Sequence, residues 1–238
     1  MTLAASLTAR AYGLRWSILP PLTGVMMMAM LLGAVLVAPR EVVEGEVQRL
    51  FYIHVPSILA AYLSFFIVFV ASILVLVRRD LRFDPVARSA AGVGVLFTAL
   101  GLATGAIWGK PIWGVYWTWD ARLTSTLVLL LIYSGYLLAR GIGGRTDEQS
   151  ARYAAVLAII GFADVPLIHF AVDWWRTLHP QPIVTRGALP GEMMIVFLIG
   201  MVAIALLALW LIVLRTAVES MLARTESLSA ELDRYEVA

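Results

Sequence analysis

Six long apolar runs divide this chain and limit what it can fold into. They cover residues 18–38, 57–77, 89–107, 123–139, 153–172 and 193–214. A helix needs about 20 apolar residues to cross ~30 Å of hydrocarbon, so each run has roughly spanning length. Hydrophobic residues make up 61% of the chain and charged residues only 14%, which excludes a pair of ordinary soluble domains. The sequence therefore predicts an all-α integral membrane protein, a six-transmembrane-helix bundle that forms one polytopic domain over residues 1–238.

Basic residues are distributed unevenly between the connecting segments. With the N-terminus inside, the inner segments carry twelve Lys or Arg residues and the outer segments carry six. Short loops rich in Lys and Arg stay on the cytoplasmic side, so this asymmetry predicts that both termini are cytoplasmic. The outer segments are then 39–56, 108–122 and 173–192. The first run is too long for a cleavable signal, and we expect it to remain as an anchor.

The outer segment 108–122 is dense in tryptophan. It reads Trp108-Gly-Lys-Pro-Ile-Trp-Gly-Val-Tyr-Trp-Thr-Trp-Asp120 and holds four of the eight tryptophans of the chain. Gly109, Pro111 and Gly114 favour turns at its start. An interfacial aromatic belt would place similar numbers of tryptophans on both sides of a membrane, whereas six of the eight lie in outer segments. We therefore interpret this segment as a platform for a ligand.

Two histidines flank the tryptophan-rich segment. His54 closes an i, i+3, i+4, i+7 pattern that predicts an amphipathic helix at the membrane surface, formed with Val47, Leu50 and Phe51. His179 follows Trp174 and Trp175 in a proline-containing loop. A lone histidine is more often a hydrogen-bonded core residue, but two imidazoles beside aromatic faces suit a flat apolar ligand with an open metal centre. Haem is the candidate, and the absence of cysteine excludes thiolate or thioether attachment on this chain.

Charged residues near the tryptophans have two interpretations each. Asp120 stands where the fourth run begins, so it is expected either to cap free backbone N–H groups or to take part in the chemistry. Lys110, Arg122 and Arg176 are the outer cations closest to the tryptophans. They either pair with the propionates of a haem or lie against lipid headgroups.

Patterns inside the runs bear on helix packing. The Gly101–Gly105 spacing allows close helix approach, either to a partner subunit or, as is commoner, to another helix of this chain. Asp164 is expected to face the bundle interior and to be hydrogen-bonded there. Pro166 is expected to kink the same helix. The polar residues after 214 are expected to be helical and either solvated or in contact with a partner.

The stretch from Trp113 to Thr124 resembles the signature of the haem-handling WWD membrane proteins. These include the cytochrome c maturation families CcmC and CcmF and the CcsA-type synthetases. The six runs, the Gly109-Lys-Pro111 lead-in and the segment Trp174-Trp-Arg-Thr-Leu-His179 resemble CcmC most closely. CcmF-type proteins are far longer, and the CcsA type usually has more spans. The resemblance covers nearly the whole chain.

The resemblance to CcmC implies a delivery and assembly factor rather than an enzyme. Such proteins lie in the bacterial inner membrane and present non-covalent haem b at the periplasmic face to the haem chaperone CcmE. It implies CcmD and the CcmA and CcmB subunits of an ABC transporter as further partners. At the matching positions, His54 and His179 are the implied axial ligands. The implied haem-binding residues are Trp113, Trp117, Trp119, Asp120, Arg122, Trp174 and Trp175.

Two departures and two other functions remain open. Tyr116 stands where close relatives often have a tryptophan, and Pro180 follows His179 where glutamine is expected. A b-type electron-transfer subunit binds haem between histidines inside facing helices, but here only His169 lies within a run. The other alternative is a haem-exporting permease component of an ABC complex, whose ATPase would be separate because the chain has no P-loop motif. A net charge of only +2 gives no basis for nucleic-acid binding.

Overall fold

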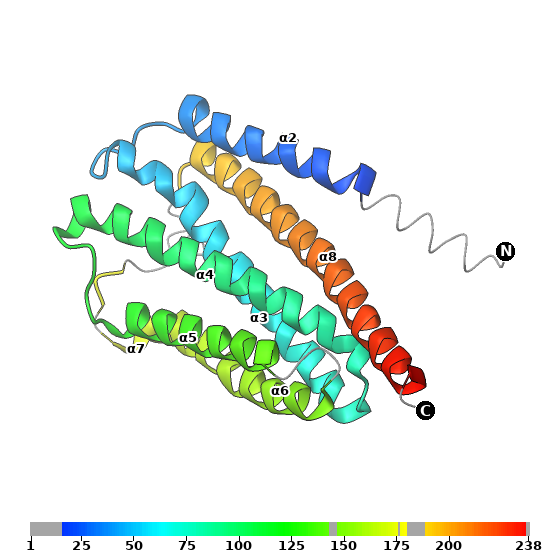
Figure 1. Cartoon of the computed structure of the whole chain (residues 1–238). Coiled ribbons are helices and arrows are strands. Elements are labelled where there is room, and N and C mark those ends of the chain that lie inside the picture. The colour runs from blue at the N-terminus through cyan, green and yellow to red at the C-terminus, as the bar shows by residue number, and fades with distance from the viewer. Residues whose placement is uncertain (1–15, 143–146, 176, 180–188, 237–238) are drawn as a thin grey trace. The chain divides into compact units, whose positions relative to one another are not determined.

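The computed structural model describes residues 16–142, 147–175, 177–179 and 189–236, with side chains described as far as Asp233. These residues form helices, and the described part contains no β-strand beyond an isolated bridge between Glu41 and Gly45. The helices are α2 (Leu19–Leu32), α3 (Phe51–Arg78), α4 (Asp84–Trp113), α5 (Ala121–Ile142), α6 (Glu148–Phe162), α7 (Asp164–Trp174) and α8 (Gly191–Glu236) (Figure 1). Short helical segments precede or extend three of them: η1 (Gly33–Val37), η2 (Glu46–Leu50) and η3 (Leu81–Phe83).

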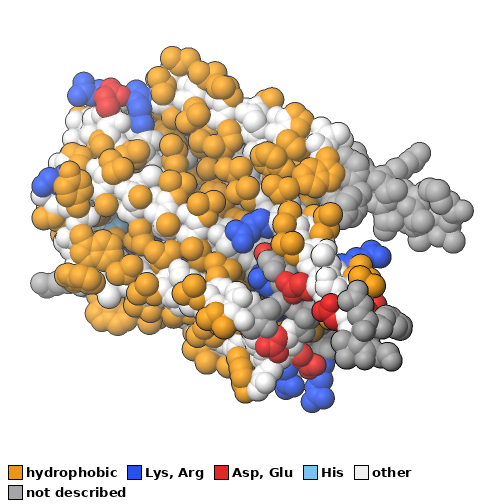
Figure 2. Space-filling model, viewed as in Figure 1, with side chains coloured by type: hydrophobic (Ala, Val, Ile, Leu, Met, Phe, Trp, Pro, Cys, Tyr) orange, Lys and Arg blue, Asp and Glu red, His pale blue; other side chains and the backbone are white. Residues whose placement is uncertain are grey.

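When these short segments are joined to their helices, and α6 is joined to α7, the described residues form six rods that are long and apolar enough to cross a membrane. The predicted all-α, six-span class is therefore confirmed. Hydrophobic side chains dominate the face drawn in Figure 2, and charged side chains occur there in small groups. Large apolar side chains such as Leu131, Leu138 and Ile160 are more than half exposed. An apolar surface of this extent is suited to lipid rather than to water.

The helices are longer than the apolar runs suggest. α4 begins five residues before and ends six residues after the run 89–107. α8 continues through the polar sequence after 214 for a total of 46 residues, which confirms the helical tail. Runs of apolar residues mark only the part of a helix that faces hydrocarbon, so the polar turns at each end are missed.

The chain divides into two compact units. Unit 1 comprises Met1–Pro56 and Pro182–Trp210, and unit 2 comprises Ser57–Gln181 and Leu211–Ala238. Unit 1 thus holds α2, η1, η2, the first turns of α3 and the apolar part of α8. Unit 2 holds the remainder of α3, the helices α4 to α7 and the polar part of α8.

Helices in unit 1 approach closely at glycine. A Cβ atom at Gly200 of α8 would lie 2.9 Å from the carbonyl oxygen of Tyr52. The ring centroids of Phe51 and Phe197 are 5.1 Å apart. Because the neighbouring atom at Gly200 belongs to the backbone, the start of α3 and α8 can only adopt this spacing with a residue that has no side chain.

The predicted helix around His54 is confirmed, and it is continuous with the second spanning helix. η2 runs directly into α3, so His54 lies in the first turns of the second spanning rod, Glu46–Arg78, and is half-buried. Arg49 holds this entry in place, since its guanidinium donates to the carbonyl oxygens of Ala34 and Ala38 and pairs with Glu46 at 2.6 Å. Carbonyl groups at the end of a helix lack intrahelical donors, and a side-chain cation satisfies them.

In unit 2, α5 packs against α4, α6 and α7 (Figure 1). Phe65 stacks on Tyr133 with 3.9 Å between ring centroids, and the Tyr133 hydroxyl donates to the carbonyl of Ala158 at 3.0 Å. Gly101 lies against the side chain of Ile58 with no room for a Cβ atom. This contact confirms that the glycine pattern serves packing against a helix of the same chain.

The fifth rod is interrupted near Pro166. α6 ends at Phe162 and α7 begins at Asp164, which confirms a distortion in this helix and shows it as a break. Asp164 is half-buried in the first turn of α7, where free backbone N–H groups favour a carboxylate. Its Oδ2 atom has no hydrogen-bond partner, so the expected hydrogen-bonded role does not hold at that oxygen.

α4 and α5 run in opposite directions, so the start of one helix lies beside the end of the other. Polar and charged residues gather at both of these ends of unit 2. The end where α4 begins and α5 finishes is called here the arginine end, defined by Asp84, Arg88, Arg140 and Glu219. The opposite end is called the tryptophan end, defined by Trp113, Trp117, Asp120 and His179. Asp84 and Arg88 lie at the start of α4 and Arg140 near the end of α5, whereas Trp113 ends α4 and Asp120 directly precedes α5.

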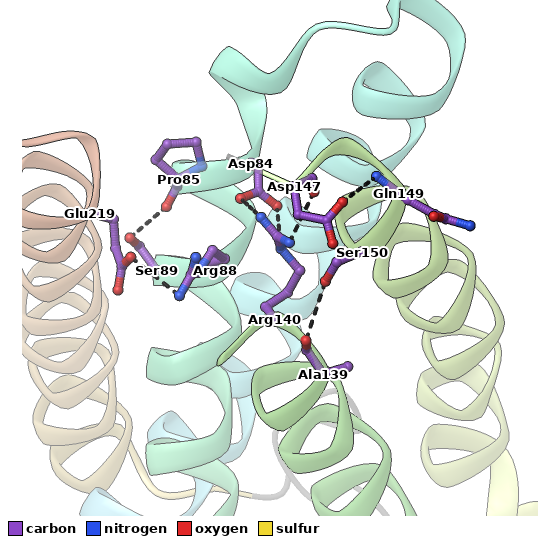
Figure 3. A network of polar contacts seen from close by, with 10 residues as sticks. All are labelled: Asp84, Pro85, Arg88, Ser89, Ala139, Arg140, Asp147, Gln149, Ser150 and Glu219. Atoms are coloured by element: carbon purple, nitrogen blue, oxygen red, sulfur yellow. Dashed lines mark hydrogen bonds and ion pairs between the residues drawn. The ribbon is translucent and has the colours of Figure 1, made fainter. Parts of the chain in front are cut away.

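A buried ion pair joins the helices at the arginine end. Arg140 is fully buried and binds Asp84 through its Nη2 and Nε atoms at 2.7 and 3.1 Å (Figure 3). Close by, Asp147 caps α6 by accepting from the N–H of Gln149 at 3.0 Å. The Ser150 hydroxyl donates to the carbonyl of Ala139 at 3.2 Å. These contacts fix α4, α5 and α6 to one another at this end.

Candidate functional site

The tryptophan end is built where α4 gives way to α5. α4 ends at Trp113, and Gly114 adopts a φ of 77° while its N–H donates to the carbonyl of Lys110 at 3.0 Å. This left-handed conformation is the usual glycine termination of a helix. Within the segment 108–122, only residues 114–120 are non-helical, so the expected turns at Gly109 and Pro111 are wrong. Gly114, rather than Gly109 or Pro111, stops the helix.

Asp120 has a structural contact and a contact to the candidate site. Its Oδ1 atom accepts from the N–H of Leu123 at 2.9 Å, which confirms that it caps the start of α5. Its Oδ2 atom accepts from the hydroxyl of Thr118 at 3.1 Å and lies 3.8 Å from the Nδ1 atom of His179. A single carboxylate therefore connects the non-helical segment, the start of α5 and a histidine that is distant in sequence.

His179 is held as a neutral imidazole. Its side chain is 16% exposed. The ring centroids of His179 and Trp113 are 5.1 Å apart, and the angle between the two ring planes is 62°. Burial, with a smaller effect of the Arg122 charge, lowers the pKa of His179 to about 4, although Asp120 opposes this shift. The distance of 3.8 Å is too long for a hydrogen bond, and Nδ1 has no partner. With Nδ1 facing the carboxylate, Nε2 is the nitrogen available to a metal.

A small hollow of about 10 Å³ lies beside His179. Its lining includes Gly105, Trp113 and Trp117. Gly105, the second glycine of the Gly101–Gly105 spacing, contributes to this space by having no side chain. The hollow is far too small for a porphyrin.

Several of these aromatic faces are exposed. Trp119 is 76% exposed and meets Trp117 edge-on, with 5.5 Å between ring centroids. Trp174 is 60% exposed, stacks on Phe170 at 5.5 Å and meets Trp175 edge-on. Exposed indole rings offer large, rigid contact areas to a flat ligand.

The structure connects most of the residues that the sequence singles out. Trp113, Trp117, Asp120 and His179 share contacts or the lining of the hollow, and Trp119 contacts Trp117. Arg122 acts on His179 through its charge. Trp174 instead contacts Phe170 and Trp175.

The remaining predicted residues have other positions. His54 lies in unit 1, at the start of α3. Lys110 donates to the carbonyl of Gly114 at 2.7 Å and covers the ring of Tyr116. Arg176 lies outside the described residues.

Sequence reasoning missed several polar residues in unit 2. The Thr118 hydroxyl donates to Asp120 and orients it. Its position as the one polar residue between Trp117 and Trp119 could have indicated this role from the sequence. The Tyr62 and Thr124 hydroxyls are buried without a hydrogen-bond partner, and so is the indole nitrogen of Trp117, a residue that the sequence did single out. Such atoms are rare in proteins and often mark a position where water or a ligand completes the hydrogen bonding. Nothing in the sequence pattern distinguishes Tyr62 from other aromatic residues of its run.

The sequence model of the family described as "Heme exporter protein C" matches residues 2–231. The chain belongs to this family. The heme exporter protein C of Bradyrhizobium diazoefficiens is 42% identical over 176 residues, which cover 71% of this chain and 65% of that protein. The heme exporter protein C of Haemophilus influenzae is 34% identical over 185 residues, which cover 76% of this chain and 75% of that protein.

A plant relative extends the heme exporter protein C comparison. The putative cytochrome c biosynthesis ccmC-like mitochondrial protein of Marchantia polymorpha is 42% identical over 146 residues, covering 61% of this chain and 60% of that protein. The chain thus spans less than two thirds of the Bradyrhizobium and Marchantia proteins. The resemblance to CcmC that the tryptophan motif carries is confirmed at the level of the family.

Proposed function

We propose that this chain binds haem at its tryptophan end and delivers it to a haem chaperone for the biogenesis of c-type cytochromes. The observation that carries the proposal is the contact of Asp120 with both the start of α5 and the imidazole of His179. The names of the relatives, a heme exporter protein C and a ccmC-like protein of cytochrome c biosynthesis, support haem as the cargo.

His179 is the proposed ligand of the haem iron at this end. Its imidazole is neutral at pH 7, as ligation requires, and Asp120 faces the nitrogen that does not ligate. His54, in unit 1, is the proposed second axial ligand, and this role rests on the resemblance to CcmC. Two imidazoles hold haem b non-covalently without a thiolate, which suits a chain that contains no cysteine.

The aromatic residues are proposed to supply the contact area for the porphyrin. Trp119 is the most exposed of them, and Trp113, Trp117, Trp174 and Trp175 complete the set. Arg122, whose charge acts on His179, is the proposed partner of a haem propionate. One porphyrin edge has to remain uncovered, because the acceptor must reach it during delivery. The chain then acts as an assembly platform, and bond formation belongs to the haem and its acceptor.

The proposed surroundings follow from the family and from the charge pattern. We infer a single polytopic domain in a bacterial inner membrane, with both termini cytoplasmic and the tryptophan end periplasmic. The concentration of arginines at the opposite end, including Arg88, Arg140 and Arg224, supports this orientation. The proposed partners are a CcmE-like haem chaperone, a CcmD-like small membrane protein and the CcmA and CcmB subunits of an ABC transporter.

The electron-transfer alternative has little support among the described histidines. His169 is exposed on α7, His179 lies outside the helices, and His54 lies within α3 but in unit 1. A b-type haem held inside a helix bundle requires inward-facing histidines. Haem delivery is therefore preferred.

A transfer assay tests the proposal. The purified chain is loaded with haem and mixed with a soluble CcmE-like acceptor, and covalent haem on the acceptor is measured by haem staining. We expect Trp117→Ala combined with Trp119→Ala to reduce transfer at near-normal protein level. Tyr153→Ala is the control, since Tyr153 is an aromatic residue of α6 whose exposure is similar to that of Trp119. Undiminished transfer by the double variant would contradict the platform role.

A further inference from the structure

A second pocket lies at the arginine end of unit 2. It has a volume of about 410 Å³ and is formed by η3, the first turns of α4 and the polar part of α8. Its walls include Arg82, Asp84, Arg88, Glu219, Arg224 and Ser227. Pockets of this size accommodate small molecules or headgroups. Haem binding at the tryptophan end uses none of these residues.

Positive charge exceeds negative charge around this pocket. Asp84 forms an ion pair with the fully buried Arg140, which neutralises its charge. Glu219 forms an ion pair with the Nη2 atom of Arg88 at 3.5 Å (Figure 3). The exposed Arg82 pairs with Asp80. These three pairs leave the wall residue Arg224 as an additional cation.

Arg215 adds a further cation beside the pocket. Its guanidinium lies across Gly92, one turn along α4 from Arg88, where a Cβ atom at Gly92 would meet it at 2.5 Å. The electrostatic balance of the pocket therefore favours an anion.

Arg88 supplies a second, independent indication of an anionic ligand. Its side chain is only 9% exposed, and its Nη1 atom is buried without a hydrogen-bond partner. An unsatisfied guanidinium donor is costly in a protein interior. Arg88 also lines the pocket, so a small rotation of its guanidinium would bring this donor to an anionic oxygen there. Arginine forks match the geometry of phosphate and carboxylate oxygens.

We propose that this pocket binds a phosphate ester, with the headgroup of an anionic phospholipid as its source. α8 changes from apolar to charged sequence at Arg215, and α4 begins with Asp84, so the pocket lies where two spanning helices leave the apolar region. Basic pockets between spanning helices at this level bind anionic headgroups. Leu81 and Ala223 in the wall provide apolar contact for the adjoining glycerol and acyl groups. A soluble phosphate compound offers the same anionic chemistry without acyl chains.

Native mass spectrometry of the delipidated full chain in detergent tests this site. The probes are phosphatidylglycerol, zwitterionic phosphatidylcholine and inorganic phosphate. We expect one phosphatidylglycerol molecule to be retained in preference to phosphatidylcholine. Arg224→Gln should weaken this binding about fivefold, as expected for one arginine at a lipid surface. Arg88→Gln combined with Glu219→Gln should weaken it as well, without leaving a buried carboxylate unpaired.

Arg152→Gln is the matched control. Arg152 is an exposed arginine of α6 at the same end of unit 2, and it does not line the pocket. Its substitution should leave retention unchanged. Inorganic phosphate binding that is lost in Arg224→Gln would also support the site and would identify a soluble source. Equal losses in Arg152→Gln and Arg224→Gln, or no preference for phosphatidylglycerol together with no phosphate binding, would overturn the proposal.

Discussion

The Nδ1 atom of His179 lies 3.8 Å from the Oδ2 atom of Asp120, whose other oxygen caps α5. The orientation of the imidazole is therefore coupled to the position at which a spanning helix begins. Carboxylates that face the second nitrogen of a metal-binding histidine fix its tautomer and increase its basicity. If His179 is the iron ligand, as proposed, we expect the distance of 3.8 Å between Nδ1 and Oδ2 to shorten to hydrogen-bond length when haem binds.

Asp120→Asn is expected to separate the two contacts of this carboxylate. Asparagine caps helices as well as aspartate does, so thermal stability should remain near that of the wild type. The loss of charge beside His179 should weaken haem binding by about 10–100-fold, as for other residues that support a metal ligand. Haem titration followed by absorption spectroscopy measures the affinity.

Asp120→Ala is the companion variant. It removes the cap as well and should cost about 1 kcal/mol of additional stability. If Asp120→Asn bound haem as tightly as the wild type, the contact with His179 would have no role in binding.

Asp84→Asn is expected to be strongly destabilising, because it leaves Arg140 charged and fully buried. Breaking a buried ion pair from one side costs about 3–5 kcal/mol, whereas replacing both partners with apolar residues is often tolerated. We therefore expect Asp84→Leu combined with Arg140→Leu to recover much of the lost stability. Thermal unfolding in detergent measures both variants.

The surface pair Arg82–Asp80 provides the control for this prediction. Asp80→Asn should change stability little, because exposed ion pairs are screened by water and salt. A loss in Asp80→Asn as large as that in Asp84→Asn would show that burial of Arg140 is not the cause.

Gly200→Ala is expected to destabilise unit 1. The new Cβ atom would lie 2.9 Å from the carbonyl oxygen of Tyr52, and backbone has to move to relieve the overlap. Overpacking of this kind costs about 1–3 kcal/mol. Gly24→Ala in α2 is the control, since no atom lies within 4 Å of its Cβ position and alanine favours helix by about 0.5–1 kcal/mol. Melting temperatures that fall equally in both variants would exclude packing at Gly200 as the reason.

The fold was predictable because apolar runs of spanning length have few alternatives to a helix in lipid. The ends of the helices were not predictable in the same way. Lys110 is polar and Pro111 is typical of turns, yet both lie in the last turn of α4. Tertiary contacts decide such turns, and the Trp113 ring lies against Gly109 and His179.

The candidate site was only partly readable from the sequence. The tryptophan motif, Asp120 and His179 were identified from their residue types and placement. The contact between Asp120 and His179 could not be predicted, because 59 positions separate the two residues and no local sequence pattern shows that they are close in space. The arginine-end pocket was missed for the same reason, because its walls come from the start of α4 and the far end of α8.

The absorption spectrum of the haem-loaded chain, compared between single histidine variants, tests the central claim most directly. We expect His179→Ala and His54→Ala each to lose the low-spin spectrum of bis-imidazole haem and to regain it when imidazole is added. His169→Ala is the matched control and should keep the wild-type spectrum, because its exposed side chain lies on α7. An unaltered bis-imidazole spectrum in both His54→Ala and His179→Ala would contradict the account.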